Sequence, residues 1–241
     1  MQKFPMIFAL VFALFATQAN AQILNQEQLE PEAKMLRDFR ENEPDEQLNI
    51  SIPLYGGILK FNLIDDFEPV FQAQDARQFV KEYVPQGETV KDWTKMLTVL
   101  AFRNGGLSPR TNREMVELFG STRQCAGHAF SKFISEENRD HGLSLTIFSS
   151  GCGNNMSGAY QDAIDGTGEQ NVVFMFRDPA HIQMLQYAVR GEAFLEGDEP
   201  LGATEIDAIQ TSLAPLSFCV PADSSEDCET SRAAEILRKA Q

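Results

Sequence analysis

Hydrophobic and polar residues alternate along several short stretches in the middle of the chain, and this period of two predicts β-strands. In residues 58–64, for example, Leu59, Phe61 and Leu63 form one apolar face. Residues 95–103, KMLTVLAFR, are apolar on both faces, so this strand is expected to be the more deeply buried one. Strands are expected at residues 50–57, 58–64, 70–74, 78–84, 95–103, 128–135, 143–150, 171–176 and 182–194.

Short turns join three pairs of these stretches, and we expect each pair to form an antiparallel hairpin. The hairpins occupy residues 50–64, 128–150 and 171–194. Strand pairs joined by turns, rather than strand-helix-strand units, are typical of the α+β class. We therefore expect an antiparallel sheet built from hairpins, with helices packed on one face.

The clearest helix start is a capping box, in which Thr111 and Glu114 each satisfy a free backbone N–H. An apolar stripe follows it, and we expect the helix to end near Gly127. That boundary places Cys125 in the last turn, from which a disulfide would join the helix to the sheet. Further helices are expected from Thr204 onward and at residues 232–239.

The first 21 residues have the organisation of a secretory signal peptide. Lys3 precedes an apolar run at residues 6–16, and an Ala-Asn-Ala triplet ends at Ala21, after which we expect cleavage. The run is about half of the roughly 20 residues needed to cross a bilayer. Position 22 is glutamine and not the cysteine of a lipoprotein. We therefore expect a soluble periplasmic or secreted protein with no membrane span.

The rest of the chain divides into two parts by composition. Residues 22–48 are rich in Glu and Gln, and we expect an acidic N-terminal extension that forms a short surface helix or stays loose. Residues 49–241 are expected to form a single α+β domain.

The net charge is −15, and it becomes −16 once Lys3 is removed with the signal peptide. The basic residues form no cluster longer than the Arg238-Lys239 pair. This composition argues against binding to nucleic acid or to an anionic membrane. A protein or small-molecule partner is left open.

Four cysteines in an exported chain predict two disulfides. The simplest of the three pairings joins Cys125 to Cys152 and Cys219 to Cys228. The chain contains no Cys-x-x-Cys motif, which argues against a thioredoxin-type redox centre or a zinc knuckle. Structural disulfides are favoured over reactive thiols.

The motifs of familiar enzymes are missing from the sequence. The three histidines, His128, His141 and His181, lack zinc-ligand spacing, and no Gly-x-Ser-x-Gly elbow or Walker motif occurs. We accordingly expect no catalytic residues, no metal and no cofactor. Cys152 stands in a tight turn like a nucleophile, but an exported cysteine with an available partner is more often oxidised.

A long Gly-, Ser- and Asn-rich loop is expected at residues 151–170, and loops of this length are often functional. Arg177, Asp178 and His181 follow it closely and are candidate binding residues. If the protein is an enzyme, a hydrolase site is expected here.

Trp93, the sole tryptophan, follows a turn made by Pro85 and Gly87, in which Glu88 can accept backbone N–H bonds. A core position is favoured for its side chain, with a ligand platform as the alternative. The segment P-x-G-E-x(4)-W-T-x-M resembles a stretch found in uncharacterised exported proteins of Gram-negative bacteria. The resemblance covers about residues 79–190 and implies a compartment and a fold, with no established reaction.

Together these features favour a non-catalytic binding or envelope-support protein. Two alternatives stay open, namely a hydrolase with a site near the 151–170 loop and a small-molecule carrier with a cavity between sheet and helices.

Overall fold

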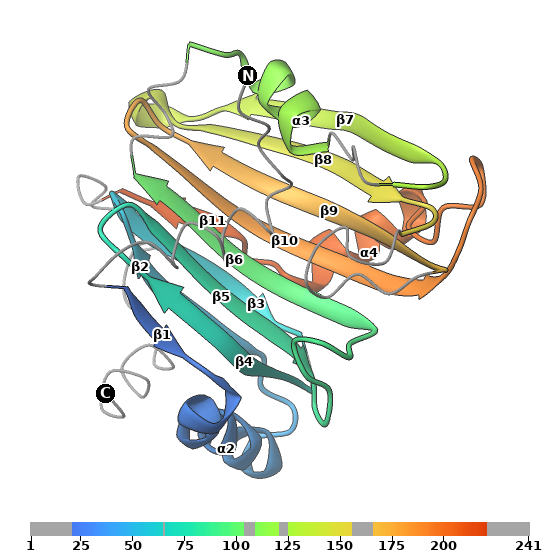
Figure 1. The fold of residues 1–241 in the computed structure, drawn as a ribbon. Helices are drawn as coiled ribbons and strands as arrows, with labels where there is room; N and C mark the ends of the chain where they lie inside the picture. The colour runs from blue at the N-terminus through green and yellow to red at the C-terminus, as the bar shows by residue number, and fades with distance from the viewer. Residues whose placement is uncertain (1–20, 65, 104–108, 121–124, 156–165, 221–241) are drawn as a thin grey trace.

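A large antiparallel sheet dominates the computed structural model, which describes residues 21–64, 66–103, 109–120, 125–155 and 166–220 (Figure 1). Its eight strands follow the order β1-β4-β5-β6-β10-β9-β8-β7. They are β1 (Gln22–Leu24), β4 (Phe67–Gln74), β5 (Gln78–Pro85), β6 (Lys95–Arg103), β7 (Ala129–Asn138), β8 (Ser144–Cys152), β9 (Thr167–Arg177) and β10 (His181–Glu192). The predicted α+β class is therefore confirmed, and every pairing in this sheet is antiparallel.

A second sheet of three strands, in the order β11-β3-β2, packs against the first one. It contains β2 (Leu48–Leu54), β3 (Gly57–Leu63) and β11 (Ser217–Cys219). The predicted hairpin at 50–64 is the β2–β3 pair, and the other two are β7–β8 and β9–β10. All three hairpins are confirmed. The alternation of apolar and polar residues does not predict that the β2–β3 hairpin lies in a different sheet from the other two.

The main core lies between the two sheets. Phe61 of β3 and Phe174 of β9 are fully buried in it, because successive side chains on a strand point to opposite faces. The other face of the main sheet is also apolar. There Leu100 of β6 and Met175 of β9 pack with further buried side chains. Strand β6 is buried on both sides, as its continuous apolar sequence predicted.

Helices cover both faces of the main sheet, so the expectation of one helical face is wrong. Helix α4 (Ala203–Ser212) contributes Ile209 to the core between the sheets, whereas α3 (Asn112–Gly120) contributes Met115 and Val116 to the opposite face. Figure 1 shows α3 in front of β7 and β8, and α4 behind the sheet. The physical reason is that β6, β9 and β10 carry apolar side chains on both faces, so both faces of the sheet must be shielded from water.

The acidic extension is an ordered part of the fold. Its first residues form the edge strand β1, and residues Gln26–Asn42 form helix α2, which begins with a capping box of Asn25 and Gln28. Leu29, Ala33 and Leu36 bury one side of the helix. Glu32 on α2 also pairs with Lys81 of β5 at 2.7 Å. The expected loose segment or short surface helix is therefore a 17-residue helix packed on the sheet.

The capping box of α3 is confirmed, since Glu114 N donates to Thr111 Oγ1 at 3.2 Å and Thr111 N donates to the Glu114 carboxylate. The helix ends at Gly120, however, seven residues before the expected stop at Gly127. Cys125 therefore lies outside the helix and forms an isolated bridge with Asn155. The expected helix at 232–239 lies outside the described residues.

Candidate functional site

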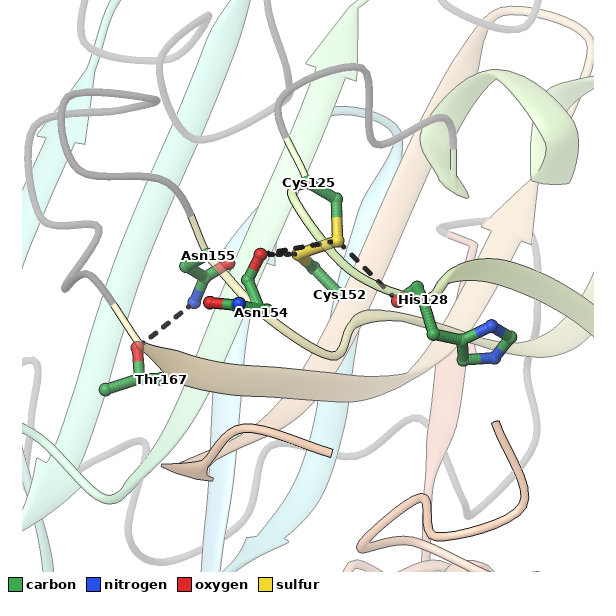
Figure 2. The surroundings of a disulfide bond; sticks show 6 residues. All are labelled: Cys125, His128, Cys152, Asn154, Asn155 and Thr167. Atoms are coloured by element: carbon green, nitrogen blue, oxygen red, sulfur yellow. Dashed lines mark hydrogen bonds between the residues drawn. A yellow bond between two sulfur atoms is a disulfide. The ribbon is translucent and has the colours of Figure 1, made fainter. Parts of the chain in front are cut away.

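The predicted disulfide between Cys125 and Cys152 is present, with Cα atoms 5.6 Å apart (Figure 2). It joins the segment after α3 to the end of β8 and does not attach the helix itself. Backbone hydrogen bonds reinforce the connection, because Ala126 N donates to Asn154 O and Gly153 N donates to His128 O. Cys152 is oxidised, and the nucleophile interpretation is thereby contradicted. Cys228 lies outside the described residues, so its pairing with Cys219 stays a prediction.

Trp93 fills the core, as the favoured interpretation predicted. It is 4% exposed and packs with Val84, Met96 and Ala188. The guanidinium of Arg190 lies 3.9 Å from the centre of the indole ring. The buried ring leaves no open platform for a ligand.

The turn before Trp93 shows why its residues occur together. Gly87 has φ of +87°, a backbone conformation that glycine adopts without steric cost. The Glu88 carboxylate accepts hydrogen bonds from both Thr94 N and Thr94 Oγ1 at 2.7 Å. The segment is therefore a closed structural turn that positions the tryptophan.

The expected loop at 151–170 is shorter than predicted. Gly151 and Cys152 belong to β8, and residues 167–170 belong to β9. Glycines at both ends suggested a loop, but their lack of a side chain permits a close approach: a Cβ on Gly151 would lie 2.8 Å from Glu169 O. Residues 156–165 lie outside the described residues.

Arg177 points away from the other two candidates of its turn. It donates from Nη1 to Arg110 O at 2.8 Å and to Asn112 Oδ1 at 3.0 Å, at the start of α3. Its role is to hold the helix start against β9. The structure therefore separates Arg177 from Asp178 and His181, because neighbouring residues of a strand face opposite sides.

Asp178 and His181 form a close pair in the turn between β9 and β10. Asp178 Oδ1 accepts the N–H groups of Ala180 at 2.6 Å and of His181 at 2.7 Å, which closes the turn. Its Oδ2 lies 3.0 Å from His181 Nδ1. The carboxylate thus fixes the direction of the imidazole, whose side chain is 21% exposed.

The imidazole also contacts the second sheet. Gly56, in the turn between β2 and β3, has φ of +82°, and a Cβ at this position would lie 2.7 Å from His181 Nδ1. A larger residue would meet the ring and would strain the turn. His181 is consequently held where the ends of the two sheets meet.

Tyr55 and Arg103 lie beside this contact. The Arg103 guanidinium stacks 4.8 Å from the centre of the Tyr55 ring. Tyr55 is fixed in turn, because its hydroxyl donates to Gln78 O at 2.9 Å and its own carbonyl accepts from Gln183 Nε2. Burial raises the pKa of Tyr55 and the charge of Asp75 adds to this, while Arg103 partly offsets it. The phenol is therefore neutral and acts as a donor.

Arg77 completes the arrangement. Its carbonyl accepts from Arg103 N at 2.7 Å, and Arg103 lies directly opposite His181 in the register of β6 and β10. Both arginine side chains are exposed, and neither pairs with a carboxylate in the described part of the chain. We call Arg77, Arg103 and His181 the basic corner. Guanidinium groups with free N–H edges are suited to binding carboxylate or phosphate oxygens.

Sequence reasoning found His181 and Asp178 but missed Tyr55, Arg77 and Arg103. The sequence alone does not show the register of the strands. Arg103 is the last residue of β6, and Arg77 directly precedes β5, which pairs with β6. Pairing these two strands would have brought the two arginines together.

No protein-family model matches the chain, and no curated protein is significantly similar to it. None of the described helices is both long and apolar enough to cross a membrane. Within the described ranges, no group of three or more His, Cys, Asp or Glu side chains is placed to hold a metal ion.

Proposed function

We propose that the chain is an exported protein of the bacterial envelope that binds a ligand at the basic corner and catalyses no reaction. The observation that carries this proposal is a pair of exposed arginines beside an imidazole whose direction is fixed, and among the described residues neither arginine has a carboxylate partner. In a chain of net charge −15, exposed guanidinium groups that pair with no carboxylate of the described residues are available to an anionic ligand.

The proposed location is the periplasm or the extracellular space. It is supported by the signal-peptide pattern and by a disulfide between Cys125 and Cys152, a bond typical of oxidising compartments. The resemblance of the Trp93 segment to exported Gram-negative proteins points the same way. The test is amino-terminal sequencing of the protein from the periplasmic fraction of its host. A mature chain that begins at Gln22 is expected, and an uncleaved cytosolic chain would contradict the location.

Binding is favoured over catalysis because the reactive groups of this region hold the structure. Asp178 closes its own turn and fixes His181, and Cys152 is part of a disulfide. In the described residues, no Ser, Thr or Cys side chain is hydrogen-bonded to His181. A base without a side-chain nucleophile in hydrogen-bond reach is not the arrangement of a serine, threonine or cysteine hydrolase.

The alternative of a hydrolase retains one supporting observation, the Asp178–His181 pair itself. A carboxylate that orients an imidazole is the arrangement that general bases use. The two functions differ in a simple assay of the exported protein on ester, peptide, glycan and phosphate substrates. We expect no turnover. Turnover that disappears in His181→Gln and persists in His128→Gln would establish the enzyme and end the binding proposal.

The positive test is native mass spectrometry of the protein purified from its own host without denaturation. We expect a bound small molecule that is absent from Arg103→Ala and retained by Lys95→Ala. Lys95 is an exposed cation at the opposite end of the same strand, roughly 27 Å away at 3.4 Å per residue. Equal occupancy of both variants would place the ligand elsewhere.

A further inference from the structure

We infer that the ligand of the basic corner carries a small oxyanion, a carboxylate or a phosphate group, on a soluble molecule. This inference rests on the proposed function and names the chemistry of its ligand. It follows from the placement of two guanidinium groups and one imidazole at neighbouring strand ends.

The spacing of the strands brings the three groups within reach of one anion. Arg77, Arg103 and His181 are contributed by consecutive positions across the sheet, and neighbouring strands lie about 4.8 Å apart. The side chain of Arg77 is exposed and long enough to reach an oxygen group that is bound by Arg103, whose guanidinium lies against Tyr55. His181 cannot move in the same way, because Asp178 and Gly56 hold its ring.

The stacking of Arg103 on Tyr55 prepares its guanidinium for a planar or tetrahedral oxyanion. Arg103 Cζ lies 4.8 Å from the centre of the ring, and within the described residues the guanidinium donates no hydrogen bond, so its N–H groups remain for a ligand. Tyr55 cannot rotate away easily, since Gln78 and Gln183 bind its hydroxyl and its carbonyl. A fixed guanidinium loses less conformational entropy on binding than a free one.

Two carboxylates lie close to the corner, and both are engaged by their own turns. Asp75 accepts from Arg77 N at 2.6 Å and from Gln78 N at 2.9 Å, and Asp178 accepts the N–H groups of its turn. The second oxygen of each carboxylate also has a partner, Gln78 Nε2 for Asp75 and His181 Nδ1 for Asp178, and within the described residues neither carboxylate forms an ion pair with Arg77 or Arg103. The guanidinium edges therefore remain available to an anion from solution.

The charge of the whole molecule selects a small ligand over a polyanion. At physiological ionic strength the screening length is about 8 Å, so a compact anion at the corner interacts mainly with the nearest charges, which include the exposed guanidinium groups of Arg77 and Arg103 as well as Asp75 and Asp178, and little with the rest of the protein's negative charge. A nucleic acid or an anionic membrane would extend far beyond them and meet a protein of net charge −15. Phosphate or carboxylate on a soluble molecule is therefore favoured over the headgroup of a lipid.

The test is isothermal titration of the exported protein, freed of any bound ligand by dialysis, with sodium phosphate, with sodium acetate, and with vesicles that contain phosphatidic acid. We expect binding of at least one soluble anion and no binding of the vesicles. Arg103→Ala is expected to weaken it about ten- to a hundredfold, the effect of losing a hydrogen bond to a charged group. Arg103→Lys keeps the charge but loses the paired N–H groups, and an intermediate loss is expected. Lys95→Ala should bind like the wild type.

Three results would overturn the inference: no binding of either soluble anion, equal binding by Arg103→Ala, or binding of vesicles in preference to soluble anions. The emission of Trp93, which lies in a separate core cluster, verifies that each variant is folded. If the anions fail while native mass spectrometry still shows a bound molecule that depends on Arg103, the ligand class is wrong and the proposed function stands. If both measurements fail, the proposed function fails as well.

Discussion

The contact of Arg190 with Trp93 and Glu169 allows a quantitative test of the core. Arg190 Nε donates to Glu169 Oε1 at 2.7 Å, and its guanidinium covers the indole ring at 3.9 Å. The side chain of Arg190 is 3% exposed and that of Glu169 is 19% exposed. The pair is therefore largely removed from water, and loss of one partner removes the main charge compensation of the other.

The perturbation is Arg190→Met, which keeps the apolar stem and removes the charge. Breaking a buried pair costs about 3–5 kcal/mol, and a desolvated cation–π contact contributes about 2 kcal/mol. Because Glu169 can still reach water, we expect the lower part of this range, a loss of about 3 kcal/mol in the free energy of unfolding. Glu169→Gln leaves a neutral acceptor for the arginine, and a loss of about 2 kcal/mol is expected.

The assay is urea unfolding followed by the fluorescence of Trp93, with far-ultraviolet circular dichroism as the second probe. If the two residues act as a pair, the double variant should be about 2 kcal/mol more stable than the sum of the single losses implies. Glu192→Gln, an exposed carboxylate on the same strand, is the matched control and should change stability by less than about 0.5 kcal/mol. Strict additivity of the two single variants would refute the reasoning.

Three further predictions concern stability. Replacing both Cys125 and Cys152 by Ala should cost about 3–4 kcal/mol, the chain-entropy value for a separation of 27 residues, and a loss below about 1 kcal/mol in urea unfolding would contradict it. In Gly56→Ala the new Cβ would collide with the His181 ring and the residue would keep a positive φ, so the free energy of unfolding should fall by about 1–3 kcal/mol. The control is Gly191→Ala, whose Cβ would meet no atom within 4 Å, and its free energy of unfolding should stay within about 1 kcal/mol of the wild type. The backbone N–H and the hydroxyl of Thr111 donate to the Glu114 carboxylate and lower its pKa in the folded protein. The ionised carboxylate therefore stabilises the fold at pH values above the ordinary carboxyl pKa, and this stabilisation is lost as the pH falls through the lowered pKa of the folded state. Glu114→Gln should therefore flatten the acid side of the stability profile in urea unfolding at a series of pH values, and an unchanged profile would exclude this cap as a source of acid sensitivity.

Local patterns predicted the elements well because local chemistry determines them. Strand β6 has the predicted bounds, Lys95 to Arg103, and the capping box at Thr111 begins α3. The division into two sheets was not predictable in the same way. The pairing of β3 with β11 joins residues about 160 positions apart, and a period of two does not specify which edge a strand will meet.

The candidate site shows the same limit. Asp178 and His181 are three residues apart, so their proximity follows from a turn. Arg103 reaches them only through the register of β6 with β10, and Tyr55 only through the packing of one sheet on the other. Local sequence patterns therefore predicted two of the five residues, Asp178 and His181, and the other three could be found only from strand pairing and sheet packing. It also overestimated the reach of α3, because Cys125 was read as part of the helix.

Strand β1 has a practical consequence for handling this protein. Gln22, Ile23 and Leu24 pair with Gln74, Ala73 and Gln72 and occupy the outer side of β4. Shortening the chain to begin at Asn25 would bare a row of peptide groups, which could recruit another molecule and seed aggregates. Affinity tags are therefore better avoided at this end, and trimming by proteases during storage should first appear as turbidity.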